Sequence, residues 1–430
     1  MVIGIDRIEI SGNELRCRPR LPRGLRKYLL NDTLAVRYDS SVDLEKCGES
    51  ILAIPIVSLL APIAWAAGAD IRIHELDAAY LGALIKIKDI FKDIFPWFSC
   101  AGGIYAEKAV VNDFGGGGIL LPFSGGVDSL ASYLKYKNDK PNLVLISGVQ
   151  VPLFERDYWR GMRADIDRIA GRDGVKAFHV GGNLFRDLNF ELLSRDFMVE
   201  WLEDVAGGLC LLGLCAPITA SREFGTVLIA SGHTAAYTKP SAARPVVDNE
   251  VSWAGVGVIH DSYELRRQEK LRYICQHEGK MVYLSSLRVC QESVVSENCG
   301  RCEKCFRTIT GLAVEGVNPG ECNFRVDEGT YRYIKDCFLK GKIAMGDSRR
   351  FEWEGIQKML PAQIDTDING SREFLEWLRE FDFSKYRASR LRSYIWNMRR
   401  LYGNKRMKLP SIGRKAKSYY YIILSRLGLA

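Results

Sequence analysis

Residues 120–134 read LLPFSGGVDSLASYL. An apolar run that suits a buried strand ends at Phe123, and a helical pattern begins near Asp128. Between them, Gly125 and Gly126 let the backbone approach a ligand closely, because neither residue carries a Cβ. The free N–H groups of a first helical turn, together with its dipole, attract anions. The segment therefore predicts a phosphate-binding bend between a strand and a helix.

Side chains within residues 124–129 add to this prediction. The hydroxyls of Ser124 and Ser129 are further hydrogen-bond donors, and Asp128 can cap the helix or hold magnesium. The alternative is an ordinary strand–turn–helix with serine as N-cap. The order of all six residues, 124–129, after a strand and before a helix favours the anion site over this alternative. The Walker A pattern G-x4-G-K-[ST] does not occur in the sequence, which excludes a conventional P-loop NTPase.

The pattern around the bend predicts an α/β domain over residues 115–325. Apolar runs typical of strands alternate there with helical patterns, which indicates a parallel sheet with helices on both faces. Ligands of such sheets bind at the carboxyl ends of strands. The expected strands are 118–123, 143–151, 175–181 and 226–232, and the expected helices start near 128 and cover 156–170, 190–205 and 209–224.

Residues 1–114 are predicted to form an α+β accessory module that positions substrate or acts as a scaffold. Alternating patterns over 2–10 and 32–39 suit strands, and a periodic pattern over 78–95 suits a helix. The glycine run 115–118 marks its end. Residues 50–69 carry no charge over the length of a membrane span. Two prolines and many small residues favour a buried core helix instead, so no transmembrane span is expected.

Charge is unevenly distributed in a chain whose formal net charge is +8. Residues 384–430 hold 13 Lys or Arg and no Asp or Glu, which leaves 47 basic against 52 acidic side chains elsewhere. Residues 326–430 are thus predicted to be a helical region with a basic tail. Over 384–417 the basic tail interleaves aromatic residues, which suits a nucleic acid or an acceptor protein. The apolar run 419–424 makes an anionic membrane surface a further possibility. A basic helix docked on the acidic body is the alternative. The aromatic residues are Tyr386, Tyr394, Trp396 and Tyr402.

Four of the 12 cysteines cluster in the pattern C-x8-C-x2-C-x2-C. Thiolates at this spacing can chelate one ion, and Gly300 stands where the knuckle needs a flexible backbone. We expect zinc, with an iron–sulfur cluster as the rival, and a closed set of four ligands makes the site structural. No signal pattern precedes the first strand, and the other cysteines are scattered, so a reducing, cytoplasmic location is expected. The ligands are Cys290, Cys299, Cys302 and Cys305.

The bend resembles that of the PP-loop ATP pyrophosphatase superfamily, whose fold is of the HUP type. Its members cleave ATP between the α and β phosphates, transfer AMP to a carboxylate or carbonyl oxygen, and let a nucleophile displace it. The resemblance implies that Gly148 lies along the adenine and that Gly232 and His233 lie beside the nucleotide. A loop histidine without such a role is the alternative for His233. The residues implied to hold pyrophosphate and its magnesium are Ser124, Gly125, Gly126, Val127, Asp128 and Ser129.

A predicted helix over 264–277 carries Arg267 and Lys270 on one face, at i and i+3. In the resemblance this helix follows the nucleotide-binding strand, so either cation could neutralise charge as pyrophosphate departs. A solvated helix face is the alternative. Asp261 and Glu269 are further candidates for binding magnesium.

The bend is followed about 165 residues later by the cysteine pattern, and this combination resembles the 7-cyano-7-deazaguanine synthase (QueC) family. Arg307, two residues after the last cysteine, also fits. The resemblance covers residues 118–320 and implies an ATP-dependent ligase. It would adenylate a carboxylate such as 7-carboxy-7-deazaguanine, release pyrophosphate, and form an amide or nitrile with ammonia or a protein amine. ATP, Mg²⁺ and Zn²⁺ are the implied cofactors.

Residues 233–248 lack the Tyr-Pro-Asp-Cys-Arg segment of that family. The chain is also longer, like the enlarged QueC-like proteins of anti-phage defence and surface-polysaccharide loci. Two alternatives therefore stay open. One is an ATP-dependent amidotransferase or thiolase that acts on a sugar or a tRNA. The other is a non-catalytic nucleotide-binding subunit of a defence complex.

Overall fold

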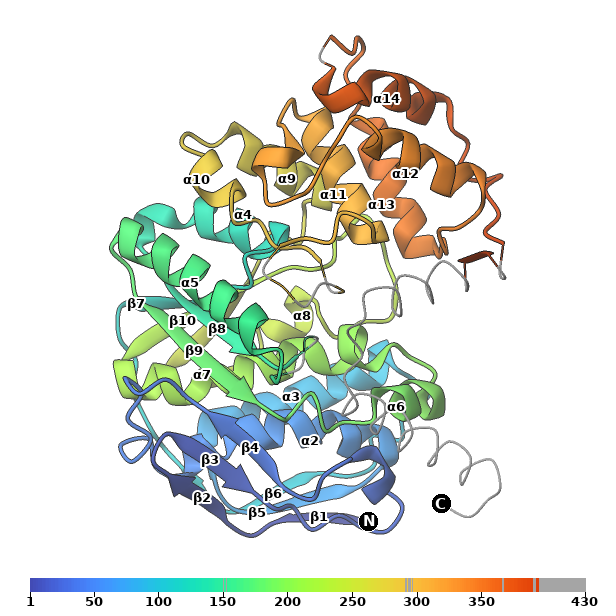
Figure 1. Ribbon diagram of the computed structural model, residues 1–430. Coiled ribbons are helices and arrows are strands. Elements are labelled where there is room, and N and C mark those ends of the chain that lie inside the picture. The colour runs from blue at the N-terminus through green and yellow to red at the C-terminus, as the bar shows by residue number, and fades with distance from the viewer. Residues whose placement is uncertain are drawn as a thin grey trace.

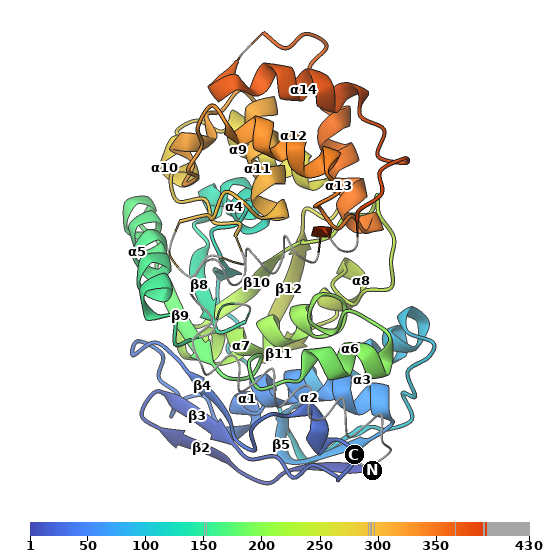
Figure 2. The ribbon, with the colours of Figure 1, turned by 45° about the vertical axis from the view of Figure 1, so that its right-hand side comes forward.

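The computed structural model describes residues 1–149, 151, 153–290, 292, 295, 297–365, 367–389 and 392–393. The fold is mixed α/β and contains two sheets (Figure 1). The smaller sheet lies at one end of the molecule, and helices from the C-terminal third of the chain lie at the other (Figure 2). The smaller sheet has three parallel strands, in the spatial order β1 (Val2–Ile5), β5 (Asp70–Asp77) and β6 (Ile104–Val110).

The larger sheet has nine strands, of which the central five are parallel. The first of these along the chain, β7, lies in the middle, with β8 and β9 on one side and β10 and β12 on the other. The order therefore reverses between β7 and β10, and ligands of open α/β sheets bind at such a switch point. In spatial order the strands are β11 (Ser252–Trp253), β12 (Val256–Asp261), β10 (Phe224–Ala230), β7 (Gly118–Pro122), β8 (Asn142–Ser147), β9 (Ala177–Gly182), β4 (Leu34–Arg37), β3 (Glu14–Cys17) and β2 (Ile8–Ser11).

Helices cover both faces of the parallel strands. Leu120 faces a core shared with α2 (Ile54–Ala67) and α7 (Gly207–Arg222), whereas its neighbour Leu121 faces a second core. The second core is shared with α4 (Val127–Lys135) and α5 (Arg156–Asp173). The predicted α/β class and its four strands are thus confirmed. The sheet as a whole is nevertheless mixed, because four of its strands pair antiparallel, and β12 is a fifth parallel strand that the sequence analysis missed.

The predicted boundary at residue 114 does not separate the two sheets. Strand β4 pairs antiparallel with β9, with Val36 opposite Gly182, so β2–β4 extend the sheet of the following unit. The alternating stretch 2–10 is also two strands rather than one. Strand β1 joins the smaller sheet and β2 the larger one, and Asp6, between them, forms an ion pair with Arg20.

The uncharged run 50–69 lies inside the protein, where it forms α1 (Glu49–Leu52) and α2. Helix α2 crosses α7 so closely that a Cβ on Gly213 would collide with Ser58 Oγ. Pro62 lacks the N–H group that would pair with the Ser58 carbonyl, and the Cys210 thiol of α7 donates to that oxygen instead, at 3.4 Å. The packing is therefore specific as well as apolar.

Among the described residues, one helix is long and apolar enough to cross a membrane, namely Trp201–Arg222. It joins a π-helical turn, Trp201–Ala206, to α7, and 83% of its most apolar window is buried inside the protein. Burial of this extent is typical of the core helix of a globular domain.

The remaining helices surround these cores or form the C-terminal region. In the described part of the predicted basic tail, Tyr386 is buried and donates to the Ile343 carbonyl at 2.8 Å, so its ring belongs to the core. Most of 384–417, with Tyr394, Trp396 and Tyr402, lies outside the described residues. The helices are α3 (Ala78–Ile94), α6 (Phe190–Phe197), α8 (Pro245–Asp248), α9 (Arg267–Gln276), α10 (Met281–Leu284), α11 (Glu303–Val314), α12 (Thr330–Leu339), α13 (Asp347–Lys358) and α14 (Ser371–Glu380).

Candidate functional site

The bend at 124–129 lies at the switch point, after β7 and before α4. Gly125 has φ +67°, in the left-handed region that favours glycine, and Gly126 is the N-cap of α4. The Arg288 N–H donates to the Gly125 carbonyl at 2.8 Å, and a Cβ on Gly126 would lie 3.3 Å from the Arg288 carbonyl. The bend is therefore held from outside by a segment that lies just before the cysteine cluster.

The two hydroxyls of the bend are loosely bound to the protein. Ser129 Oγ accepts from the Ser124 N–H at 3.3 Å, donates to the Gly126 carbonyl at 3.3 Å, and lies 3.4 Å from Ser124 Oγ. Strong hydrogen bonds of hydroxyl groups are closer to 2.7–2.8 Å. Both hydroxyls can thus turn to an anion in the bend without losing a strong bond.

Strand β10 ends beside β7 and brings Ser231, Gly232 and His233 to the same edge of the sheet. Lys270 Nζ donates to the Ser231 carbonyl at 2.6 Å, which ties this loop to α9. A Cβ on Gly232 would have no neighbour within 4 Å, so the backbone is open at that point. The structure thus brings the two predicted segments of the site together.

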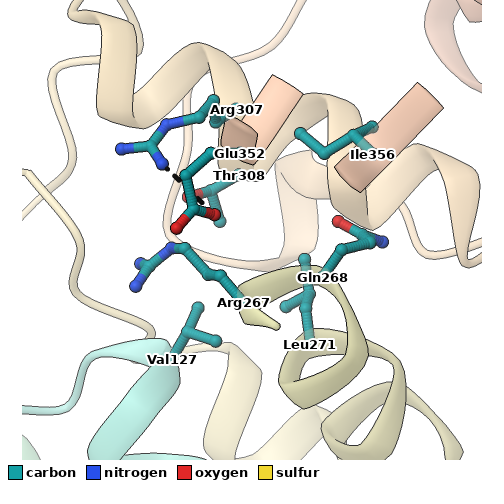
Figure 3. A pocket seen from close by; sticks show the side chains of 8 residues that line it. All are labelled: Val127, Arg267, Gln268, Leu271, Arg307, Thr308, Glu352 and Ile356. Carbon is teal, nitrogen blue, oxygen red and sulfur yellow. Dashed lines mark ion pairs between the residues drawn. The ribbon is translucent and has the colours of Figure 1, made fainter. Parts of the chain in front are cut away.

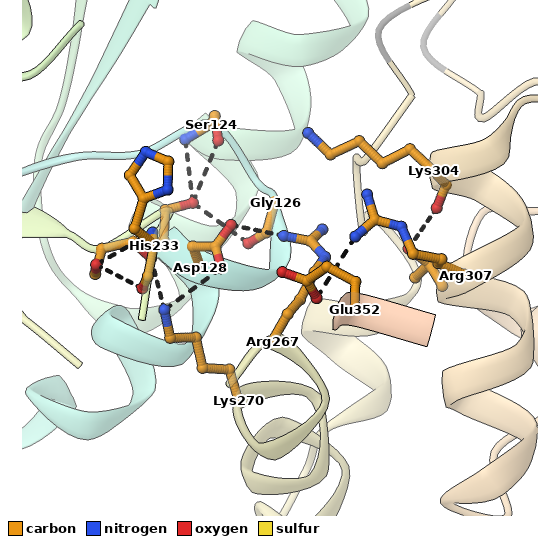
Figure 4. Close-up of polar contacts among 12 residues, drawn as sticks. Ser124, Gly126, Asp128, His233, Arg267, Lys270, Lys304, Arg307 and Glu352 are labelled. Carbon is orange, nitrogen blue, oxygen red and sulfur yellow. Dashed lines mark hydrogen bonds and ion pairs between the residues drawn. The ribbon is translucent and has the colours of Figure 1, made fainter. Parts of the chain in front are cut away.

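Asp128, Arg267 and Lys270 converge beside the bend (Figure 4). Arg267 Nη1 donates to Asp128 Oδ2 at 2.7 Å, and Lys270 Nζ lies 3.7 Å from Asp128 Oδ1. Burial alone would raise the pKa of the Asp128 carboxyl. The charges of Arg267 and Lys270, with a smaller contribution from Lys304, together outweigh burial and lower that pKa to about 2. Asp128 is therefore ionised at neutral pH.

The two cations are not on a solvated helix face, because the Lys270 side chain is only 2% exposed. Helix α9 begins at Arg267, three residues later than the predicted start, since Glu269 accepts from the Arg266 N–H at 2.6 Å and caps it. Arg267 and Lys270 therefore lie in the first turn, where the helix dipole disfavours cations. Such an arrangement needs a nearby anion, which Asp128 supplies in part.

Sequence reasoning missed Lys304, the second residue of α11. Figure 4 shows its side chain extending toward the bend from the helix that carries Arg307. Burial, helped by the positive charge of Arg267, lowers the pKa of the Lys304 ammonium to about 8. The signal available in the sequence was a lysine between the last two cysteines, but only the fold reveals that it faces the bend.

Two predicted residues, His233 and Gly148, remain to be placed. His233 Nε2 lies 3.7 Å from Asp204 Oδ1, an atom that Lys239 Nζ approaches to 2.7 Å. Burial, and then the charge of Lys239, lower the pKa of His233, so its ring is neutral at pH 7. Gly148 follows β8 with φ +93°, and a Cβ there would lie 2.5 Å from the Gly182 carbonyl. Glycine at this position thus serves close packing at the end of the strand.

Two carboxylates considered for magnesium are occupied by the protein. Asp261 is buried and accepts from Ser132 Oγ at 2.6 Å and Lys135 Nζ at 2.7 Å. Glu269 caps α9, as described above. Asp128 is the carboxylate that belongs to the bend itself.

A small, open pocket adjoins the bend (Figure 3). Arg307 pairs there with Glu303 at 2.7 Å and with Glu352, on α13, at 3.5 Å. The C-terminal helices thus contribute one wall beside the bend. The lining residues are Val127, Arg267, Gln268, Leu271, Arg307, Thr308, Glu352 and Ile356.

The four clustered cysteines come together as predicted, with Sγ atoms that all lie within 4.8 Å of one another. Cys302 Sγ lies 3.9 Å from Cys290 Sγ and 3.4 Å from Cys305 Sγ, and Cys299 Sγ lies 3.7 Å from Cys305 Sγ. Four sulfurs at about 2.3 Å from one tetrahedral zinc ion would stand about 3.8 Å apart. The cluster could therefore hold a metal ion such as zinc.

The surrounding backbone also suits a single ion. Backbone N–H groups of Arg301 and Cys305 each donate to a cluster sulfur at 3.4 Å, and Gly300 turns the chain with φ +62°. Asn298 Oδ1 accepts from the Val289 and Cys290 N–H groups at 3.0 Å. Thiolates that bind different irons of a cluster must stand farther apart than thiolates that share one ion. The geometry therefore fits a single metal ion, such as zinc, better than an iron–sulfur cluster.

The cysteine cluster and the bend are parts of one structure. Arg288, whose backbone bonds to the bend, lies two residues before Cys290. Helix α11 begins directly after the third cysteine, Cys302, and carries Lys304 and Arg307 in its first two turns. Comparison of this chain with family models, with curated proteins and with solved structures finds no significant match to any of them.

Proposed function

We propose that this chain is an ATP-dependent ligase of the PP-loop class, similar to the QueC family. It adenylates a small carboxylate, releases pyrophosphate, and then forms an amide or nitrile with ammonia or a protein amine. The observation that carries the proposal is the convergence of Asp128, Arg267 and Lys270 on the 124–129 bend at the switch point of the sheet.

The electrostatics of the site support binding of a polyphosphate. The first turn of α4 contributes Asp128, and the first turn of α9 contributes Arg267 and Lys270. The first turn of α11 contributes Lys304. Helix N-termini carry partial positive charge. The same turns also hold Glu269, which caps α9, and Glu303, which pairs with Arg307, so three cations and Asp128 are left beside the bend. An anion of several negative charges would relieve this excess, whereas a neutral ligand would not.

The residues can assist each step of the proposed reaction. A carboxylate oxygen attacks the α-phosphorus of ATP, the bond to the bridging oxygen of the β-phosphate breaks, and pyrophosphate leaves. The N–H groups and hydroxyls of the bend, with Arg267 and Lys270, would stabilise the negative charge that grows on that leaving group. The amine then attacks the acyl carbon, loses a proton, and AMP departs.

Asp128 has two roles in this proposal. It holds Arg267 in place through the 2.7 Å ion pair while the site is empty of nucleotide. Being ionised, it could also hold the magnesium that accompanies ATP. Arg267 and Lys270 would then face phosphate oxygens rather than a carboxylate.

The four thiolates fit a structural ion, because they leave no position for a substrate. Zinc there would supply folding stability and fix the start of α11. The proposed carboxylate is 7-carboxy-7-deazaguanine or a similar compound, and the proposed location is the cytoplasm. Attachment of an acceptor protein or nucleic acid through 384–417 concerns residues that are largely outside the described ones.

Pyrophosphate release tests the proposal. The purified chain is incubated with ATP, Mg²⁺ and 7-carboxy-7-deazaguanine, and pyrophosphate and AMP are measured with and without ammonium. We expect equal amounts of both products, dependent on the carboxylate, and about a hundredfold loss in Asp128→Asn. Asp139→Asn, an exposed carboxylate just beyond α4, is the matched control and should keep the rate. Phosphate and ADP as products, or no reaction with any carboxylate, would contradict the proposal.

A further inference from the structure

The ammonium of Lys304 has no hydrogen bond or ion pair to any residue that the structure describes. Its backbone carbonyl accepts from Thr308 Oγ, but no contact of Nζ accompanies it. The residue is only partly exposed, and both the positive charges of Arg267 and Arg307 and the negative charges of Asp128 and Glu203 act on it without direct contact. Cations in partly buried positions are usually paired, because desolvation without a partner costs free energy. Lys304 is therefore arranged for an anion that comes from outside the chain.

The direction of the side chain identifies where that anion would lie. Figure 4 shows Lys304 reaching from α11 toward Ser124 and Gly126, across from Lys270 on α9. Its charge also acts on the Asp128 carboxyl. The anion would therefore lie between the bend and α11, beside the first turn of α4.

The cysteine knuckle explains why Lys304 can hold this position. Lys304 lies between Cys302 and Cys305, whose sulfurs belong to the four-thiolate cluster. Arg288, just before that cluster, is bonded through its backbone to Gly125 in the bend. The knuckle thus links the lysine to the bend through Arg288, Cys290 and the clustered sulfur atoms.

We propose that Lys304 is the second half of the anion site, and that it binds the phosphate groups of the nucleotide from α11 while the bend binds them from α4. The inference rests on the proposed function, since it assumes a polyphosphate in the bend. It adds a binding residue that the motif does not contain. It also gives the thiolate knuckle a positioning role in addition to stability.

Calorimetric binding to the full chain tests this proposal, with ATP and Mg²⁺, inorganic pyrophosphate and adenosine as separate probes. Lys304→Gln should weaken binding of ATP and pyrophosphate by about tenfold or more, the size expected for one lost charge-assisted hydrogen bond. Adenosine binding should not change. Lys304→Arg should recover part of the affinity, because a guanidinium also binds phosphate.

Arg301→Gln is the matched control. Arg301 lies in the same knuckle, is exposed, and has its guanidinium over the Tyr333 ring at 5.4 Å rather than toward the bend. Its replacement removes the same charge and should leave ATP affinity unchanged. Zinc content, measured on each variant by atomic emission, should stay equal to that of the parent chain, so that loss of affinity cannot come from a lost metal.

The outcomes separate the two proposals. ATP affinity of Lys304→Gln that equals the parent value would overturn the Lys304 assignment alone. Equal loss in Arg301→Gln would overturn it as well, because general charge would then explain the effect. Failure of the parent chain to bind ATP or pyrophosphate would instead refute the proposed function, and the Lys304 assignment with it.

Discussion

Arg267 Nη1 lies 2.7 Å from Asp128 Oδ2, and this ion pair joins the first turn of α9 to the first turn of α4. The two residues are 139 positions apart in sequence. Arg267 occupies a position that the dipole of its own helix disfavours, and Asp128 occupies one that the dipole of α4 favours. The pair therefore stabilises the site while no ligand is bound, and it is the contact that a bound polyphosphate must rearrange.

Replacing Asp128 should lower the free energy of unfolding of the chain, because the ion pair with Arg267 is lost. In Asp128→Asn, Arg267 and Lys270 lose their common partner, so unfolding should become easier by about 1–3 kcal/mol. Inorganic pyrophosphate should restore much of the loss, because it supplies the missing charge to the same cations. Thermal melts with and without pyrophosphate measure both effects. A melting temperature that does not respond to pyrophosphate in either form would contradict this account of the site.

The same ion pair predicts a pH dependence with a definite sign. The pKa of Asp128 is lowered to about 2 in the folded chain, against about 3.9 in an unfolded one. The resulting stabilisation, about 3 kcal/mol, is present above pH 4 and is lost as the pH falls through about 2. Urea unfolding should therefore show that the difference in free energy of unfolding between the parent chain and Asp128→Asn narrows from pH 6 to pH 2.5. A difference that is constant over this range would show that Asp128 does not titrate as described.

The sequence identified those parts of the site whose chemistry is local. The residues of the bend are contiguous, and the cysteines lie within 16 positions, so short spacing alone indicated an anion cradle and a metal knuckle. The four predicted parallel strands were also visible, since buried strands appear as continuous apolar runs.

The features that were missed depend on contacts between distant segments. Alternation in residues 2–10 and 32–39 indicates strands but not which sheet they join, and the pairing of β4 with β9 decides that. Likewise, a lysine between two cysteines carries no sign of its direction, which comes from the packing of α11 beside α4 and α9. Arg267 was identified in sequence, but its partner was not, because 139 residues separate it from Asp128.

The crossing of α2 and α7 predicts that a methyl group added to Gly213 lowers stability, whereas one added to Gly171, on another helix, does not. In Gly213→Ala the new methyl group would collide with Ser58, so we expect a loss of about 1–3 kcal/mol. In Gly171→Ala, within α5, the methyl group meets nothing within 4 Å, so better helix propensity should raise stability by up to about 1 kcal/mol. Denaturant unfolding measures both changes. Equal effects of the two substitutions would contradict the close approach of α2 and α7.

Removing the metal should affect both stability and ligand binding, because the knuckle anchors Arg288 against Gly125 as well as the start of α11. Cys299→Ser should lower the bound zinc below one ion per chain, reduce the melting temperature, and weaken pyrophosphate binding. Cys322→Ser is the matched control, since Cys322 is a buried thiol outside the cluster and should leave zinc content unchanged. Zinc by atomic emission and pyrophosphate affinity by calorimetry are measured on the same preparations. If the zinc-depleted variant stays folded and binds pyrophosphate as the parent does, the knuckle supports only its own segment, and the bend is held by the sheet and α4 alone.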